Sequence, residues 1–330
     1  GALVLQSATD RCVVVACQGR NDKHVLIRQY GDDEVLEYRL PLSSFYSGHG
    51  TFAETAEFGV LFDRHGGAWA KPVAGVLLML LHGGYLPHLA GGATIVFESG
   101  LDPQAGLGAS AALAVASTQA VCALYELTLD TATRAAVAHG ACRQVAAASD
   151  GTAAAMTSLV AQPGALLQVR CQPLDMLGPL HLPAGVTVVG IDSGVRVDVA
   201  GRHLETRVAA LLGRRIIADS TRSRPGVEDT TRGYLANVSP EEFVQRHRDV
   251  LPNRLTGRDA LARFGTNGDP RLTISPDCVY KIRSRTEHYI YDNRRSQQFS
   301  ACLARAARTG QVDPLIEAGQ LMYASHWSYG

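Results

Sequence analysis

The sequence has no excess of charge of either sign and no long apolar segment. Lys plus Arg and Asp plus Glu both number 31 among the 330 residues, so the formal net charge is zero. A chain with zero net charge has no overall positive potential that would attract nucleic acid or an anionic membrane surface. The longest apolar run, residues 73–81, is too short to span a bilayer. We therefore expect neither a nucleic acid nor a membrane as a partner.

Cysteine pairs and zinc-type clusters are also missing. The seven cysteines are an odd number, and neither a CxxC pair nor a Cys/His group with zinc-ligand spacing occurs. Most of them lie in apolar runs, as Cys12 does before three valines. Buried free thiols are typical of a reducing compartment, so we expect a cytoplasmic protein.

Strand-like and helix-like patterns are mixed in blocks along the chain. This arrangement favours an α+β fold over a doubly wound parallel sheet. The strands that we expect cover residues 11–17, 25–29, 35–40, 93–98, 166–172, 186–192 and 279–283. The expected helices cover residues 68–82, 110–127, 131–148, 205–217, 240–248, 257–264, 293–308 and 314–328.

The most informative segment is a glycine-rich loop between the strand at 93–98 and the helix that begins at Ser110. It contains the run Gly106-Leu107-Gly108-Ala109-Ser110. The first amides of a helix have no intrahelical acceptor and carry partial positive charge, so they favour a phosphate. Glycine allows a ligand to approach the backbone closely, and a first-turn hydroxyl can bind Mg²⁺.

These residues alone leave an alternative open. A glycine-rich turn can lead into a buried helix without binding any ligand. The loop also has neither a Walker A sequence nor the GxGxxG pattern of dinucleotide-binding folds.

The run from Gly106 to Ala112 resembles the GLGSSAA loop of the GHMP kinases. Later segments, in the same order, are similar to L-arabinokinases and galactokinases within that superfamily. These segments are residues 190–196, 213–217, 234–240, 283–293 and 321–326. The resemblance implies a two-lobed fold, with an N-terminal ribosomal-protein-S5-like lobe over residues 1–152 and a C-terminal ferredoxin-like α/β lobe over residues 153–330.

The same resemblance implies an ATP-dependent sugar 1-kinase, which transfers the γ-phosphate of ATP to the anomeric hydroxyl of a sugar similar to L-arabinose or galactose. The amides of Gly106, Leu107, Gly108, Ala109 and Ser110 would hold the phosphates, with the Ser110 hydroxyl on Mg²⁺.

Trp69 lies where galactokinases place a residue beside the adenine of the nucleotide. The alternative for Trp69 is plain core packing.

The acceptor site departs from the family pattern. The family's aspartate beside the reacting hydroxyl aligns with Ala154, and a methyl group cannot accept a proton. Asp150 lies four residues earlier, about one helical turn, and is our catalytic candidate; its alternative role is a helix N-cap. Gly151, which opens the aligned stretch, and His203, near the position of a sugar-binding tyrosine, are the candidate substrate contacts. A surface histidine is the alternative for His203.

Further departures concern the loop and the chain ends. Gln104 takes the place of the first loop glycine. The family's N-terminal substrate motif would precede Gly1, and its C-terminal glycine-rich loop would follow Gly330. We expect both to have been lost from this sequence by trimming or disorder.

Three hypotheses follow from this pattern. The chain is an active sugar kinase with an altered acceptor site, a catalytically silent homologue that binds nucleotide or sugar as a regulator, or a kinase for a modified sugar of secondary metabolism. We interpret the polar residues around His288 and Asp292 as a surface ion network.

Overall fold

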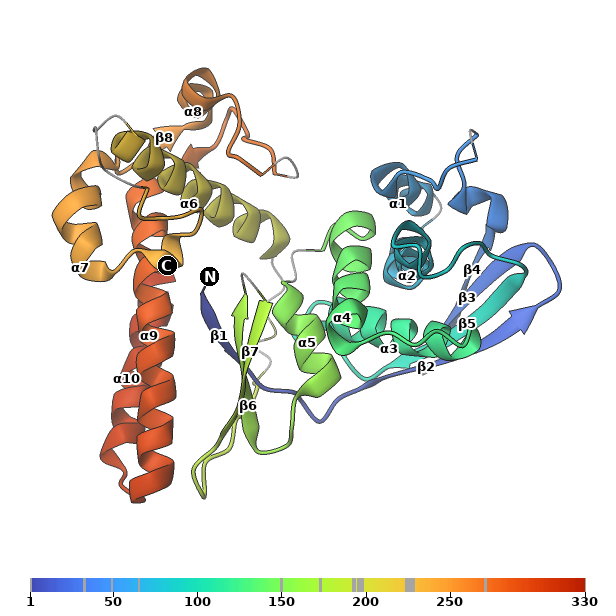
Figure 1. Ribbon diagram of the computed structural model, residues 1–330, viewed down its shortest axis with the longest axis horizontal. Helices are drawn as coiled ribbons and strands as arrows, with labels where there is room; N and C mark the ends of the chain where they lie inside the picture. Colours follow the sequence, from blue (N-terminus) through green and yellow to red (C-terminus); the bar gives the residue numbers. More distant parts are fainter. Residues whose placement is uncertain are drawn as a thin grey trace. The chain divides into compact units, whose positions relative to one another are not determined.

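Figure 1 shows the computed structural model, in which the chain forms two compact units. The N-terminal unit holds residues 6–163 and 190–196, and the C-terminal unit holds residues 1–5, 164–189 and 197–330. The boundary that we predict between residues 152 and 153 stays a prediction. The structure describes residues 2–31, 34–48, 50–64, 66–148, 151–171, 174–191, 194, 199–222, 229–269 and 272–329, without the side chains of 199–203.

A four-stranded sheet forms one layer of the N-terminal unit (Figure 1). Its order is β2-β5-β3-β4; β5 runs parallel to β3, and the other two pairs are antiparallel. The strands are β2 (Val13–Arg20), β3 (His24–Tyr30), β4 (Val35–Pro41) and β5 (Gly92–Ser99). Because β5 lies between β2 and β3, it brings the chain to the glycine-rich loop from within the sheet.

Helices α1 to α5 complete this unit. α3 packs against β2, α2, α4 and α5, and α2 is buried along its whole length up to Leu81. A β-carbon on Gly59 would lie 2.6 Å from the carbonyl oxygen of Val145, so only glycine permits this approach of α1 to η3. The bounds are α1 (Thr55–Asp63), α2 (Lys71–His82), α3 (Ala109–Leu124), α4 (Thr131–Gly140), the π-helical turn η3 (Ala141–Val145) and α5 (Thr152–Val160).

The C-terminal unit combines a three-stranded sheet, ordered β1-β6-β7, with long helices (Figure 1). α9 and α10 form an antiparallel hairpin, and α6 packs against α9. Cys302, Leu303 and Ala318 of the hairpin share a core with Leu166 of β6. The elements are β1 (Leu3–Gln6), β6 (Ala165–Cys171), β7 (Leu174–His181), α6 (Val199–Arg222), α7 (Pro240–Glu242), β8 (Leu255–Thr256), α8 (Gly257–Phe264), β9 (Val279–Tyr280), α9 (Ile282–Thr309) and α10 (Asp313–Tyr329).

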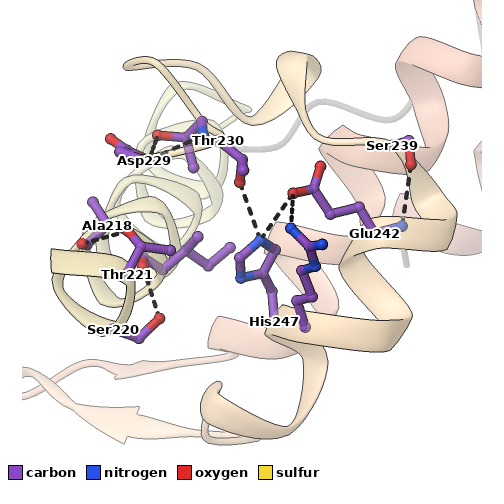
Figure 2. Close-up of polar contacts among 11 residues, drawn as sticks. Ala218, Ser220, Thr221, Asp229, Thr230, Ser239, Glu242 and His247 are labelled. Atoms are coloured by element: carbon purple, nitrogen blue, oxygen red, sulfur yellow. Dashed lines mark hydrogen bonds and ion pairs between the residues drawn. The ribbon is translucent and has the colours of Figure 1, made fainter. Parts of the chain in front are cut away.

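A buried histidine joins the segment after α6 to the helical turns that follow α7. Figure 2 shows Nε2 of His247 between Thr230 and Glu242. It lies 3.1 Å from Oγ1 of Thr230 and 3.8 Å from Oε1 of Glu242. These contacts engage Nε2 of a ring that is 2% exposed, so we assign His247 a structural role.

Several predicted elements differ from the structure. Residues 186–191 form no strand, and the predicted strand over 279–283 ends at Tyr280 because α9 begins at Ile282. The helix predicted over 131–148 divides into α4 and the π-helical turn η3. The sequence patterns did not predict β7. In this strand Gly178 has a φ of +92°, and the pairing register between β6 and β7 shifts at this point. A bulge of this kind interrupts the alternation by which strands are recognised.

In the described ranges, no helix combines the length and the apolar character needed to cross a membrane.

Candidate functional site

The loop between β5 and α3 is held by its own hydrogen bonds over its first half. The Ser99 hydroxyl accepts from the amide of Leu101 at 3.2 Å and donates to its carbonyl at 3.0 Å. Oδ1 of Asp102 accepts from the amide of Gln104 at 2.8 Å. These short-range bonds fix the chain between the end of the strand and the glycines.

Two glycines with left-handed backbone complete the loop. Gly106 has a φ of +71° and Gly108 a φ of +73°, a region that other residues adopt only at a cost. A β-carbon on either would meet nothing within 4 Å, so open space borders the backbone here. Gly108 is the N-cap of α3 and no side chain caps this helix end. The first-turn amides are therefore left for an external acceptor.

A buried side chain also forms a hydrogen bond with the start of α3. The thiol of Cys142, in the turn η3, donates to the backbone carbonyl of Ser110 at 3.3 Å. Cys142 is 1% exposed, so this contact belongs to the core. No local sequence pattern indicates this pair, because 32 residues separate the two positions.

Trp69 lies beside the strand that leads to the loop. It belongs to the 3-10 turn η2 (Ala68–Ala70), is half-buried, and has its ring centroid 5.9 Å from that of Phe97 in β5. Lys71, two residues later, is buried, and its ammonium lies 2.6 Å from Oδ1 of Asp63. Packing on Phe97 fits the core-packing alternative, and the adenine role stays a prediction.

Helix α5 begins near the predicted acceptor position. Gly151 is its N-cap, and a β-carbon there would meet nothing within 4 Å. α5 packs against α3, the helix that the loop opens, and carries the half-buried Ala154 in its first turn. Asp150 lies outside the described residues, so its role is still a prediction. His203 lies in α6 of the other unit, and its side chain is likewise outside the described part.

The residues at the loop are compatible with the predicted cofactors, ATP and Mg²⁺. Open glycines and uncapped amides suit the phosphates of ATP. In the part of the chain that the structure describes, no group of three or more His, Cys, Asp or Glu residues could hold a metal. Mg²⁺ in nucleotide sites is bound by few protein groups together with phosphates, so the half-buried Ser110 is a sufficient candidate ligand.

The chain is similar to known kinases in sequence. Residues 72–160, which include the loop and α5, match the GHMP kinases N terminal domain. The chain is 28% identical to the L-arabinokinase of Arabidopsis thaliana over 79% of its own length and 27% of that protein. It is 27% identical to the galactokinase of Chloroflexus aggregans over 72% of its own length and 50% of that protein. The chain thus spans half or less of the length of these curated relatives.

A solved structure shows the same fold. The galactokinase of Lactococcus lactis, crystallised with galactose, matches 99% of this chain and 69% of its own chain with a TM-score of 0.60. Its sequence identity is 18%, so this likeness concerns the fold. The expected α+β, two-lobed GHMP kinase fold is confirmed, as is the resemblance to L-arabinokinase and galactokinase.

Proposed function

We propose that this chain, a member of the GHMP kinase superfamily, binds ATP at the loop of residues 106–110 and transfers its γ-phosphate to a sugar. The observation that carries the proposal is the pair of left-handed glycines at the uncapped start of α3. Open backbone and unpaired amides at a helix start match the needs of phosphoryl transfer, which depends mainly on positioning and charge neutralisation.

The residues of this chain have distinct roles in the proposed reaction. The amides of Gly108, Ala109 and Ser110 bind phosphate oxygens, and the Ser110 hydroxyl is the proposed ligand of Mg²⁺. When bound, Mg²⁺ neutralises charge on the transferred phosphate. The methyl group of Ala154 cannot orient or deprotonate a hydroxyl, so Asp150 is the proposed group beside the acceptor.

The proposed acceptor is the anomeric hydroxyl of an aldose similar to L-arabinose or galactose. The names of the curated relatives, an L-arabinokinase and a galactokinase, support this choice. The substitution at position 154 makes the acceptor site the part in which this chain departs from them.

The second candidate function is a catalytically silent protein that binds nucleotide or sugar and acts as a regulator. Ala154 favours it, since the half-buried first turn of α5 carries alanine at positions 153, 154 and 155. Such a protein would bind Mg-ATP without transferring its phosphate.

Phosphorus NMR of the chain with Mg-ATP and a panel of aldoses separates the two candidates. A sugar 1-phosphate signal that disappears in Asp150→Asn supports the kinase, whereas a signal only in Ala154→Asp supports the silent homologue. Ser110→Ala should weaken Mg-ATP binding in calorimetry. Ser117→Ala, on the same helix with a buried hydroxyl that makes no hydrogen bond in the described residues, should not. Absence of Mg-ATP binding, sugar binding and turnover would contradict both candidates.

A further inference from the structure

The hairpin of α9 and α10 borders a cavity of about 580 Å³ in the C-terminal unit. This size lies within the usual range for small-molecule sites. None of the residues proposed above for nucleotide or acceptor binding lines it. Its walls come from β1, α9 and α10 and consist of Leu5, His288, Asp292, Arg295, Ser296, Phe299, Leu321, Met322, Ser325, His326 and Tyr329.

Two residues of the cavity lining, His288 and Arg295, contact the hydroxyl of Ser328. This hydroxyl donates to the carbonyl of Ser325 at 2.9 Å and accepts from Nη1 of Arg295 at 2.8 Å. Nδ1 of His288 lies 2.7 Å from the same oxygen. Since the hydroxyl proton is already used, we assign the proton of this contact to Nδ1. Nε2 of His288 is then an acceptor.

His288 differs from its sequence-based interpretation. It is 6% exposed and lies edge-on to the ring of Tyr329 at 5.2 Å, so it is not part of a surface ion network. Burial lowers the pKa of its imidazole, which keeps the ring neutral near pH 7.

Asp292 and Arg295 supply the charged groups of the lining. Oδ1 of Asp292 lies 3.5 Å from Nη1 of Arg295. This oxygen is shut off from solvent, so a ligand in the cavity would not reach it. The side chain as a whole is 33% exposed, so the exposed part of the carboxylate is the acceptor that a ligand can reach. An accessible carboxylate beside a guanidinium suits a group that both donates and accepts.

The rest of the lining includes apolar side chains, and the two charges of the cavity cancel. The apolar residues are Leu5, Phe299, Leu321 and Met322. An anionic ligand would face Asp292 and a cationic ligand would face Arg295, so a net charge is disfavoured in either case. A neutral ring that carries both hydroxyls and C–H groups matches this mixed lining.

We propose that this cavity is a second binding site, whose ligand is a neutral cyclic polyol such as a monosaccharide. Asp292 accepts from ligand hydroxyls, Arg295 donates to them, and the apolar side chains of the lining contact C–H groups of the ring. The site shares no residue with the proposed acceptor site and does not depend on phosphoryl transfer.

Methionine-methyl NMR of the intact chain tests this proposal. The sequence has four methionines, and Met322 lines the cavity, whereas Met79 and Met156 lie in α2 and α5 of the N-terminal unit. Galactose, L-arabinose and myo-inositol serve as probes, and Met322→Leu assigns the signal. We expect a saturable shift of the Met322 methyl signal in the millimolar range.

Variants on α9 provide the controls. Asp292→Asn and Arg295→Lys should weaken the Met322 response by about ten-fold, the usual effect of removing a hydrogen bond to a charged group. Glu287→Gln makes the same change of charge on the same helix, away from the cavity walls, and should bind as the wild type does.

Three outcomes would overturn the proposal: no shift of Met322 with any probe, full binding by Asp292→Asn and Arg295→Lys, or a preference for phosphate or an ammonium compound. Sugar phosphorylation measured on the same samples keeps the two sites apart. Loss of the Met322 response with turnover intact contradicts only this site, and a response without turnover contradicts only the kinase proposal.

Discussion

A β-carbon placed on Gly213 would lie 1.8 Å from Oγ1 of Thr286, closer than real β-carbons approach any heavy atom. Gly213 lies in α6 and Thr286 in α9, so this contact sets how closely the two helices pack. The threonine is fully buried, and its hydroxyl donates to the carbonyl of Ile282 at 2.8 Å. The side chain therefore cannot move away without losing a buried hydrogen bond.

We predict that Gly213→Ala lowers the free energy of unfolding by about 1–3 kcal/mol, because overpacking forces the helices apart. Gly319→Ala is the matched control, since Gly319 lies in α10 and its β-carbon would meet nothing within 4 Å. That variant should gain about 0.5–1 kcal/mol, since alanine favours the helix. Urea unfolding followed by circular dichroism measures both, and equal effects would contradict the close contact.

Gly108→Ala should weaken Mg-ATP binding as well as stability. An alanine held in the left-handed backbone conformation at φ +73° costs about 1–2 kcal/mol relative to glycine. If the backbone changed conformation to avoid this cost, the first-turn amides of α3 would point in a different direction. Gly84, with a φ of +69° and equally open surroundings, carries the same backbone cost away from the loop. Gly84→Ala should lose stability but keep nucleotide affinity in calorimetry. If both variants bind Mg-ATP alike, the loop is not the phosphate site.

Two cysteines at the start of the N-terminal sheet should differ in reactivity. Cys12 is exposed, whereas burial raises the pKa of the Cys17 thiol to about 11. Thiolates are the reactive form, so at pH 8 only about one Cys17 in a thousand can react. Mass spectrometry after brief iodoacetamide treatment should find the label on Cys12. Cys12→Ser should leave this region unlabelled, and rapid labelling at Cys17 in that variant would contradict the burial.

The stability of the C-terminal unit should fall as the pH is lowered through the range of histidine titration. Burial lowers the pKa of His288 below its ordinary 6.5. The charge of Asp292 raises this pKa by less than burial lowers it, and the charges of Arg295 and Arg285 lower it further. The unfolded chain therefore binds the proton more tightly than the folded chain. The stabilisation from the neutral ring is complete above pH 6.5 and is lost as the pH falls below that value.

His288→Gln should flatten this slope in urea unfolding between about pH 7.5 and pH 5, a range that extends on both sides of the ordinary pKa of histidine. The exposed His82 offers the control, and His82→Gln should leave the slope unchanged. An unchanged slope in His288→Gln would show that other groups govern the pH dependence.

The sequence by itself predicted those features that depend on neighbouring residues. The bounds of α8 at Gly257 and Phe264, the strand before the glycine-rich loop and the helix after it could all be predicted. Helix periodicity, caps and glycines act over a few residues, so their patterns are visible along the chain.

Only the tertiary structure decided which distant residues meet. Cys142 reaches the carbonyl of Ser110, Gly213 faces Thr286, and the end of α10 closes over His288. The interpretation of His288 as part of a surface network was wrong because burial depends on what packs above a residue, and no local pattern records that. These contacts join residues 32, 73 and 40 positions apart, and their geometry arises only when helices pack.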